Sequence, residues 1–159
     1  MDYPTEKNNF LVEHILDLTR SYRNLLSRDL VSPALSNTEL AHYLFHAPFA
    51  LVSHNTAADP IFNYANLTAL TLFELSWTDF TQLPSRLSAE PINQATREQL
   101  LARVTQNGYI DNYAGIRIAS TGKRFLIKNA TVWNVYDDKQ IGKGQAAAFA
   151  CWEFLPFCA

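Results

Sequence analysis

The feature that most constrains the fold is the C-terminal third of the chain, where three β-rich segments follow one another with only short polar connections. These segments are residues 109–120, 124–137 and 145–154. The first connection is a Ser-Thr-Gly-Lys turn, and the second contains two glycines. Because consecutive strands joined by short turns pair side by side in opposite directions, these segments predict an antiparallel three-stranded meander.

The middle segment has an unusual side-chain pattern. Side chains alternate between the two faces of a strand, so every second residue from position 125 shares one face. That row consists of Phe125, Ile127, Asn129, Thr131, Trp133 and Val135. Its ends are apolar, and its middle holds an amide, a hydroxyl and an indole. Two explanations are open: the polar groups line a ligand cavity, or they bond to neighbouring backbone in a filled interior.

The preceding residues predict a helical N-terminus and two further strands. A capping box at Ser36 and Glu39 predicts a helix through about residue 47. Strands are expected at 49–54 and 61–65, followed by three short to medium helices. Pro91 suits the first turn of the last of these. The order therefore predicts an α+β fold with one five-stranded antiparallel sheet, helices on one face, and an N-terminal helix outside that core.

An apolar seam runs along the expected helix at residues 9–28. Its members are spaced by four, three, four and three residues, as on one helix face. They are Leu11, Ile15, Leu18, Tyr22 and Leu25. Two heptads do not establish a coiled coil, so packing within the chain and packing against a second copy are both open. We predict that residues 1–35 form an extension with this seam as a homodimer interface, and that residues 36–159 form the domain proper.

Composition excludes several classes of protein. A chain of 159 residues with 48% hydrophobic content suits one globular domain. Its formal net charge of −2 argues against a nucleic-acid partner. The acidic N-terminus is not a secretory signal, and no apolar run is long enough to span a membrane. The two cysteines form no metal-binding motif, which suits a reduced, cytoplasmic location.

The order of two strands, a helical middle and a three-stranded meander resembles that of the PAS domain, as does IFNYANLTALTLFELSWTDF at 61–80. Within PAS-like sequences, the chain resembles the MEKHLA family. The segments that carry this resemblance are FALVSHNTAADPIFNYAN (49–66), LPSRLSAEP (83–91), GKRFLIKNATVWNVYD (122–137) and GKGQAAAF (142–149).

The resemblance implies a non-catalytic sensory or regulatory module with a small molecule in a cavity between sheet and helices. The sheet order should place the last strand centrally, antiparallel to the first. A cavity of a few hundred cubic ångströms is expected. Its lining residues are predicted to be Phe73, Trp77, Arg86, Ile127, Asn129, Thr131 and Trp133. Arg86 would meet an anionic group of the ligand, whereas Arg117 is expected to face outward.

The family also occurs as the C-terminal domain of plant homeodomain–leucine-zipper regulators. No homeodomain or basic region is present here, so DNA binding is not carried over. The expected partners are an unidentified small molecule, a second copy of the chain and an effector protein in another chain.

The cofactor remains unknown. Ser85 lies where light-sensing PAS proteins have the cysteine that forms a flavin adduct, so no covalent flavin is expected. Arg86 alone is weak support for non-covalent flavin. No histidine lies in residues 91–108, where haem-binding PAS domains place theirs. His42 and His46 share a helix face but lack the glutamate of an H-E-x-x-H zinc motif, so no metal is predicted.

Two other functions are open. One is a ligand-free protein-interaction domain, which should have a filled interior and an exposed apolar patch. The other is a small enzyme with the cone-shaped fold of ketosteroid isomerase, for which Asp111 could be the base; this rests on fold analogy alone. Cys151 is expected to be a buried structural thiol.

Overall fold

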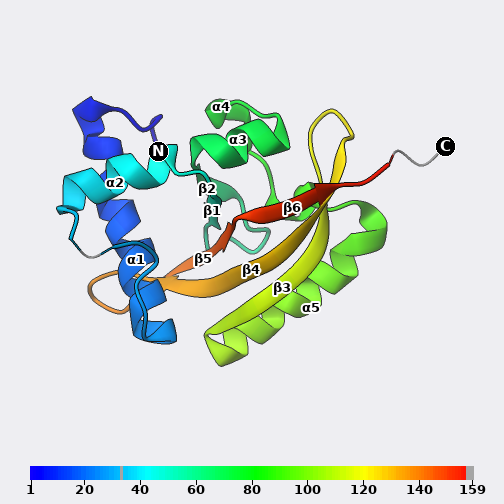
Figure 1. Ribbon diagram of the computed structural model, residues 1–159. Helices are drawn as coiled ribbons and strands as arrows, with labels where there is room; N and C mark the ends of the chain where they lie inside the picture. The colour runs from blue at the N-terminus through cyan, green and yellow to red at the C-terminus, as the bar shows by residue number, and fades with distance from the viewer. Residues whose placement is uncertain (33, 157–159) are drawn as a thin grey trace.

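The computed structural model describes residues 1–32 and 34–156, and Figure 1 shows a curved antiparallel sheet flanked by helices. The elements run in the order η1 (Glu6–Leu11), α1 (Val12–Leu26), α2 (Asn37–His46), β1 (Ala50–His54), β2 (Phe62–Ala65), α3 (Leu67–Phe73), α4 (Trp77–Phe80), η2 (Ser85–Ser88), α5 (Pro91–Asn107), β3 (Tyr109–Ile118), β4 (Arg124–Tyr136), β5 (Gly142–Phe149) and β6 (Cys151–Phe154). The structure therefore confirms the predicted α+β class and element order.

The sheet has the order β2-β1-β5-β4-β3, and β6 pairs with β4. The predicted central position of the last long strand is confirmed, since β5 lies between β1 and β4 and is antiparallel to both. The expected strand at 145–154 is divided at Ala150 into β5 and β6. Residues 131–136 of β4 pair with β5, whereas residues 125–128 pair with β6. Six strands are thus described where five were predicted.

A β-bulge interrupts β4 at Asn129. Ile127 pairs with Gly115 and Ala130 pairs with Tyr113, so β4 has one more residue than β3 in this interval. Asn129 itself has a φ of 53°, in the left-handed region. An extra residue in a strand moves the following side chains to the opposite face. The prediction that positions 125 to 135 form one row on a single face is therefore wrong.

A second bulge lies in β3 at Asn112, which also has a φ of 53°. Here the extra residue belongs to β3, between the pairs Ile110↔Val132 and Tyr113↔Ala130. The two bulges compensate, so the strands regain their pairing although each has changed the face of its side chains. Asp111 and Arg117 are six residues apart and would share a face in a regular strand, but the bulge at Asn112 places them on opposite faces.

Helix α1 covers one face of the sheet. Ile15 and Leu18 are fully buried and Tyr22 nearly so, in the same core as the sheet residues. The edge of the Tyr22 ring meets Trp133, with 4.9 Å between the ring centroids. Leu11 and Leu25 pack against the same core. The seam is therefore intramolecular, and the predictions that it forms a dimer interface and that this helix lies outside the core are wrong.

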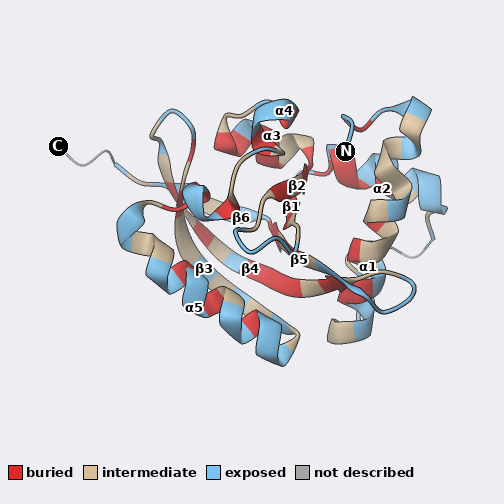
Figure 2. Ribbon diagram, turned by 180° about the vertical axis from the view of Figure 1, so that it is seen from behind, coloured by how far each residue is buried: buried red, intermediate tan, exposed pale blue. Residues whose placement is uncertain are grey.

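Helix α5 covers the opposite face, as Figures 1 and 2 show. It begins with Pro91 at its first position, as the sequence predicts, and ends at Asn107 with Gly108 as its C-terminal cap. Its Leu100 and Val104 pack on Val132 of β4. Helices thus cover both faces, because the apolar seam of α1 packs on the face that the sequence left uncovered.

Asn66 joins three elements at the edge of this sheet. Its side-chain oxygen accepts hydrogen bonds from the backbone N–H groups of Leu51 and Ala69, which caps α3 and holds β1. Its side-chain nitrogen donates to the carbonyl oxygens of Leu44 and Phe49. This fully buried amide is therefore completely satisfied, as buried polar groups normally are.

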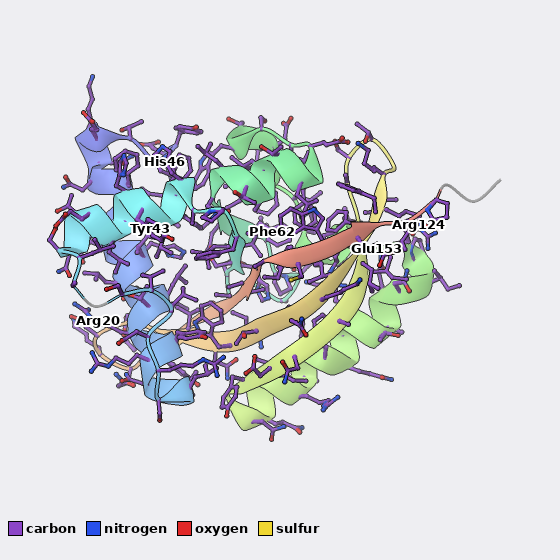
Figure 3. All side chains as sticks on the ribbon, in the orientation of Figure 1. Arg20, Tyr43, His46, Phe62, Arg124 and Glu153 are labelled. Atoms are coloured by element: carbon purple, nitrogen blue, oxygen red, sulfur yellow. The ribbon has the colours of Figure 1, made fainter. Side chains whose placement is uncertain are left out.

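The side chains fill most of the space between the layers (Figure 3). Phe62 lies in the middle of the molecule, stacked on Phe80 with 4.2 Å between ring centroids, whereas Arg20 and Tyr43 lie at the periphery. None of the described helices is both long and apolar enough to cross a membrane.

Candidate functional site

A cavity lies between the sheet and the helices on the α5 side. Its volume is about 60 Å³. Its wall comes from the five strands β1 to β5 and from α3, η2 and α5. Much of it is apolar, and the apolar residues include Val52, Phe62, Phe73, Ile127, Val132 and Phe149. The cavity is several times smaller than the few hundred cubic ångströms predicted, so it suits a compact molecule and is too small for a flavin.

Two arginines reach this cavity. Arg97 comes from α5 and Arg117 from β3, and their exposed fractions are only 6% and 8%. Neither takes part in an ion pair among the residues that the structure describes. Buried arginines are rare unless they are paired, because removing a guanidinium from water is costly. These two side chains are the most unusual chemical feature of the site.

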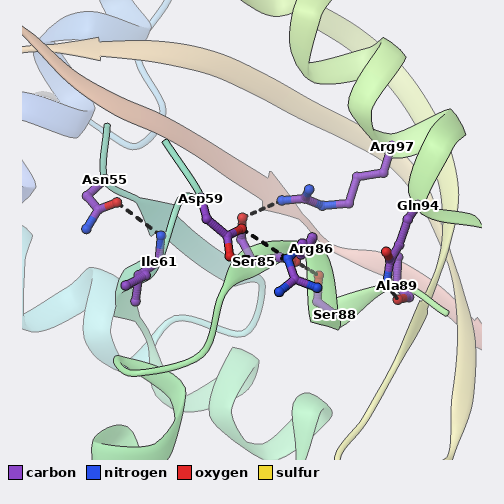
Figure 4. A network of polar contacts seen from close by, with 9 residues as sticks. All are labelled: Asn55, Asp59, Ile61, Ser85, Arg86, Ser88, Ala89, Gln94 and Arg97. Carbon is purple, nitrogen blue, oxygen red and sulfur yellow. Dashed lines mark hydrogen bonds and ion pairs between the residues drawn. The ribbon is translucent and has the colours of Figure 1, made fainter. Parts of the chain in front are cut away.

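Arg97 lies on the buried side of α5, three residues before Leu100. Its guanidinium donates a hydrogen bond to the hydroxyl of Ser85, with 2.5 Å between the atoms (Figure 4). Burial, and secondarily the charge of Arg117, lower the pKa of Arg97 to about 10. At neutral pH it is still a cation, and a second cation stands in the same cavity.

Arg117 is held by its own strand. One guanidinium nitrogen donates to the carbonyl oxygen of Ile116 at 2.9 Å, and another donates to the hydroxyl of Tyr113 at 3.3 Å. The guanidinium carbon is 5.7 Å from the centre of the Tyr113 ring, in cation–π range. These contacts hold the charge at the cavity without neutralising it.

His54 stands where the cavity adjoins the protein surface. Together with Leu101 and Gln145, it lines both the cavity and a groove between the β1–β2 loop and α5. Its Nδ1 is 2.9 Å from the carbonyl oxygen of Asn55, so Nδ1 carries the proton of the neutral ring. Nε2 is buried without a hydrogen-bond partner. Burial lowers the pKa of His54, which favours the neutral ring.

Of the seven predicted ligand residues, Phe73 and Ile127 line the cavity. Trp77 does not, since its indole N–H donates to the carbonyl oxygen of Met1 and its ring meets Tyr3 and Tyr64. Trp77, which was predicted to contact a ligand, therefore contacts Met1 and Tyr3 of the N-terminal segment instead.

Arg86 also lies outside the cavity lining. It donates to both carboxylate oxygens of Asp59, at 3.1 and 3.2 Å, on the exposed side of η2 (Figure 4). The prediction that Arg86 meets an anionic ligand group is wrong in this structure, because its charge is already paired at the surface.

The polar groups of β4 are used within the protein. Asn129 is exposed at the bulge. The hydroxyl of Thr131 donates to the carboxylate of Asp111 at 2.7 Å, and that carboxylate pairs with Arg28 at 3.0 Å. Trp133 is covered by α1. The prediction that Asn129, Thr131 and Trp133 line a ligand cavity is therefore wrong. The alternative, that Asn129 and Thr131 bond to neighbouring backbone, does not describe Thr131 either, because its partner is a side-chain carboxylate.

The residues missed by the sequence interpretation are Arg97, Arg117, His54 and Gln145. One signal was available: Arg97, Leu100 and Val104 are spaced three and four apart, so the arginine shares the apolar side of its helix. For Arg117 no comparable signal existed, because its inward orientation depends on the bulge at Asn112.

Other candidates for chemistry are not near the cavity. The pKa of Asp111 is lowered chiefly by the hydrogen bond from Thr131 and secondarily by Arg28, so this carboxylate is a poor base. Cys151, expected to be buried, is exposed on β6, and Cys158 lies outside the described residues. The rings of His42 and His46 are 4.4 Å apart, but no group of three or more histidine, cysteine or acidic side chains suited to a metal occurs among the described residues.

The strand order β2-β1-β5-β4-β3, with β5 central, and a cavity between the sheet and α5 are the features of a PAS-like fold. The structure is similar to the PAS domain of a protein from Colwellia psychrerythraea, with a TM-score of 0.60, 14% identity, and coverage of 72% of this chain and 92% of that chain. It is also similar to the light-state dimer of the fungal blue-light photoreceptor Vivid, with a TM-score of 0.59, 13% identity, and coverage of 84% and 91%.

The family follows from the sequence match. The model of the MEKHLA domain matches residues 12–154, and the chain belongs to this family. A similar relative is the homeobox-leucine zipper protein ATHB-9 of Arabidopsis thaliana, 29% identical over 146 residues, which cover 87% of this chain. The match spans 17% of the length of that relative. The family match begins within the N-terminal helix and therefore crosses the domain boundary predicted at residue 35.

Proposed function

We propose that this chain is a non-catalytic sensory module that binds a small molecule in the cavity between its sheet and α5. The observation that carries the proposal is the cavity itself, with an apolar wall and a few converging polar groups. That combination is typical of small-molecule sites. The PAS-like fold supports a sensory role, since the fold provides an interior space that a ligand can fill.

The signal would pass through the sheet to α1. Val132 and Trp133 are neighbours on β4, yet the first packs against α5 and the second against α1. A ligand that shifts Val132 on the cavity side therefore also shifts Trp133, on which α1 packs at the opposite face of the sheet. A small displacement of α1 on the sheet, without its release, would then change the surface offered to an effector protein in another chain.

Self-association belongs to the same proposal. The Vivid structure described above is a dimer, which motivates a homodimer here. Since Ile15, Leu18 and Tyr22 are buried within the chain, a homodimer that retains this structure uses a different surface. Sizing of the full chain with and without ligand tests this, because the proposed displacement of α1 predicts that the two states differ.

The binding proposal is tested by native mass spectrometry of the freshly purified full chain, with an absorption spectrum of the same sample. A bound small molecule and no visible band are expected. Ala130→Leu should abolish the bound mass, because Ala130 lines the cavity and a larger side chain fills it. Ala95→Leu is the matched control, since Ala95 is exposed on α5 and lies outside the cavity and the groove. Equal occupancy of both variants would contradict the proposal.

A ligand-free interaction domain is the second candidate, and two observations favour it. The first is the mostly filled interior, with a cavity of only about 60 Å³. Second, strand β6 pairs only with β4 among the described strands, so its other edge is open, and Phe154 at its end is exposed. Open edges are sites for strand addition by another chain. This function predicts no bound mass and no effect of Ala130→Leu on partner binding.

A further inference from the structure

We propose that the ligand of this cavity is a short organic carboxylate, with its carboxyl group between Arg97 and Arg117 and its apolar part against the aliphatic and aromatic wall. This inference rests on the proposed function and specifies the ligand class. The sequence suggested Arg86 as the residue that binds an anionic group, whereas this inference assigns that role to the buried Arg97 and Arg117.

The first step of the argument is charge. Two arginine residues are more than nine-tenths buried at one cavity, and no ion pair of the described residues includes either of them. The nearby carboxylate of Asp59 is paired with Arg86 instead. Buried like charges repel and lose hydration, which disfavours this arrangement unless a negative group joins it. A bound anion would provide that compensation.

The second step is the supply of hydrogen-bond donors. A guanidinium has five N–H donors in a planar fork that matches a carboxylate. Arg97 donates one described hydrogen bond, to the hydroxyl of Ser85. Arg117 donates two, one to the carbonyl oxygen of Ile116 and one to the hydroxyl of Tyr113. Each arginine therefore keeps further N–H groups. Tyr113 accepts from Arg117 with its oxygen, which leaves its own hydroxyl hydrogen able to donate to an anion.

The third step distinguishes a carboxylate from phosphate. Phosphate is mostly a dianion at neutral pH and needs donors on all sides, whereas much of this wall is apolar. An apolar wall instead suits the hydrocarbon part of an organic acid. At about 60 Å³ the cavity accommodates on the order of four to six non-hydrogen atoms, by the volume that one water requires. Butyrate, with six such atoms, is at the upper limit of this range.

The test is a thermal melt of the full chain at pH 7.5 in sodium butyrate, inorganic phosphate or butyramide, with ionic strength held constant by sodium chloride. Butyrate should raise the melting temperature of the wild type in a saturable manner, because a ligand that binds only the folded state stabilises it. Butyramide, which has the same shape without the charge, should not. Phosphate should not exceed chloride.

Three variants assign the effect to the cavity. Arg97→Met and Arg117→Met should each weaken butyrate binding at least tenfold in calorimetric titrations. Arg97→Lys retains the charge without the fork, and it should also bind less tightly than wild type. Arg103→Gln is the matched control, since it removes one exposed arginine of α5, and its butyrate affinity should equal that of the wild type.

The outcomes separate this inference from the proposed function. Stabilisation by phosphate alone, by butyramide as strongly as by butyrate, or equally in Arg97→Met and wild type would overturn the carboxylate assignment. If butyrate has no effect while native mass spectrometry shows a neutral bound molecule that Ala130→Leu removes, the ligand class is wrong and the sensory function stands. If no bound mass and no butyrate effect are found, both are wrong.

Discussion

The indole N–H of Trp133 in β4 donates a hydrogen bond to the backbone carbonyl oxygen of Leu18 in α1, with 3.0 Å between the two atoms. Both side chains are fully buried. The hydroxyl of Ser21 extends the same connection, since it accepts from the backbone N–H of Tyr136 at 2.8 Å. The N-terminal helix is therefore bonded to the central strands, and it completes the core on the face opposite the cavity.

Deletion of residues 1–30 should consequently disrupt the fold instead of releasing a stable monomer. The truncation removes the cover of Trp133 and Tyr64 and three buried members of the seam, each worth about 1.5–3 kcal/mol of burial. We expect loss of the cooperative thermal transition and binding of a hydrophobic dye. A truncated chain that melts cooperatively near the temperature of the full chain would show that α1 is dispensable.

Thr131→Val should raise the pKa of Asp111 without affecting the cavity. The Thr131 hydroxyl is the largest cause of the lowered pKa of that carboxylate. The free energy of unfolding should change by no more than about 1 kcal/mol, because the carboxylate keeps Arg28 and access to water. Carboxyl NMR titration measures the pKa.

Thr121→Val is the matched control for that substitution. Thr121 donates to Glu74 and is the largest cause of the lowered pKa of Glu74. This control should raise the pKa of Glu74 and leave that of Asp111 unchanged. Weaker butyrate binding in Thr131→Val would show that Thr131 faces the cavity. That result would contradict the bulge at Asn129, which places Thr131 on the α1 face of the sheet.

His14 should make the chain less stable in mild acid. Its Nε2 is 2.8 Å from the hydroxyl of Ser53, between α1 and β1, and burial lowers its pKa to about 4. The unfolded chain, with a histidine pKa of about 6.5, binds the proton more readily than the folded chain. The neutral ring therefore contributes stability that is full above about pH 6.5 and is lost as the pH falls toward about 4, up to about 3 kcal/mol.

Denaturant unfolding between pH 7 and 4 measures this contribution. His14→Gln should flatten the pH dependence over that interval, whereas His46→Gln, at an exposed position of α2, should leave it in place. The idea is wrong if His14→Gln and wild type lose stability in parallel as the pH falls.

Substitutions of Asn129 test the bulge, because they change how readily this residue adopts a positive φ. A φ of 53° favours glycine or asparagine over β-branched residues. Asn129→Gly should leave the free energy of unfolding within a few tenths of a kcal/mol, while Asn129→Val should lower it by about 1 kcal/mol or more. A stable Asn129→Val variant with unchanged strand pairing in NMR spectra would contradict the bulge.

The same bulge marks the limit of what sequence periodicity could predict. Helix caps at Ser36, Asn66 and Ser76 and the proline at the start of α5 act locally, so the order and bounds of the elements could be predicted closely. The face of a side chain is different, because it depends on every residue between it and a reference position. One extra residue at Asn129 and one at Asn112 moved the indole of Trp133 out of the predicted site and Arg117 into the real cavity.

The prediction for the N-terminal helix shows a second limit. The spacing from Leu11 to Leu25 correctly identifies one apolar helix face, but an apolar face carries no information about its partner. The sheet offers a matching surface that includes Ser53, Tyr64 and Trp133, which come from the consecutive strands β1 and β2 and from β4, far from both in the sequence. Only the pairing of these strands brings them together.

The most direct test of the ligand site is a methyl NMR titration of the full chain with sodium butyrate, with isoleucine methyl groups labelled. Ile127 lines the cavity, Ile15 is a buried residue of α1 on the other face of the sheet, and Ile92 is exposed on α5. We predict a saturable shift of the Ile127 signal with a direct nuclear Overhauser contact to the butyrate chain, and no such contact for Ile15 or Ile92. A saturable shift with direct contacts confined to Ile15 or Ile92, or no response of Ile127 up to butyrate concentrations that stabilise the chain, would contradict a ligand site between the sheet and α5.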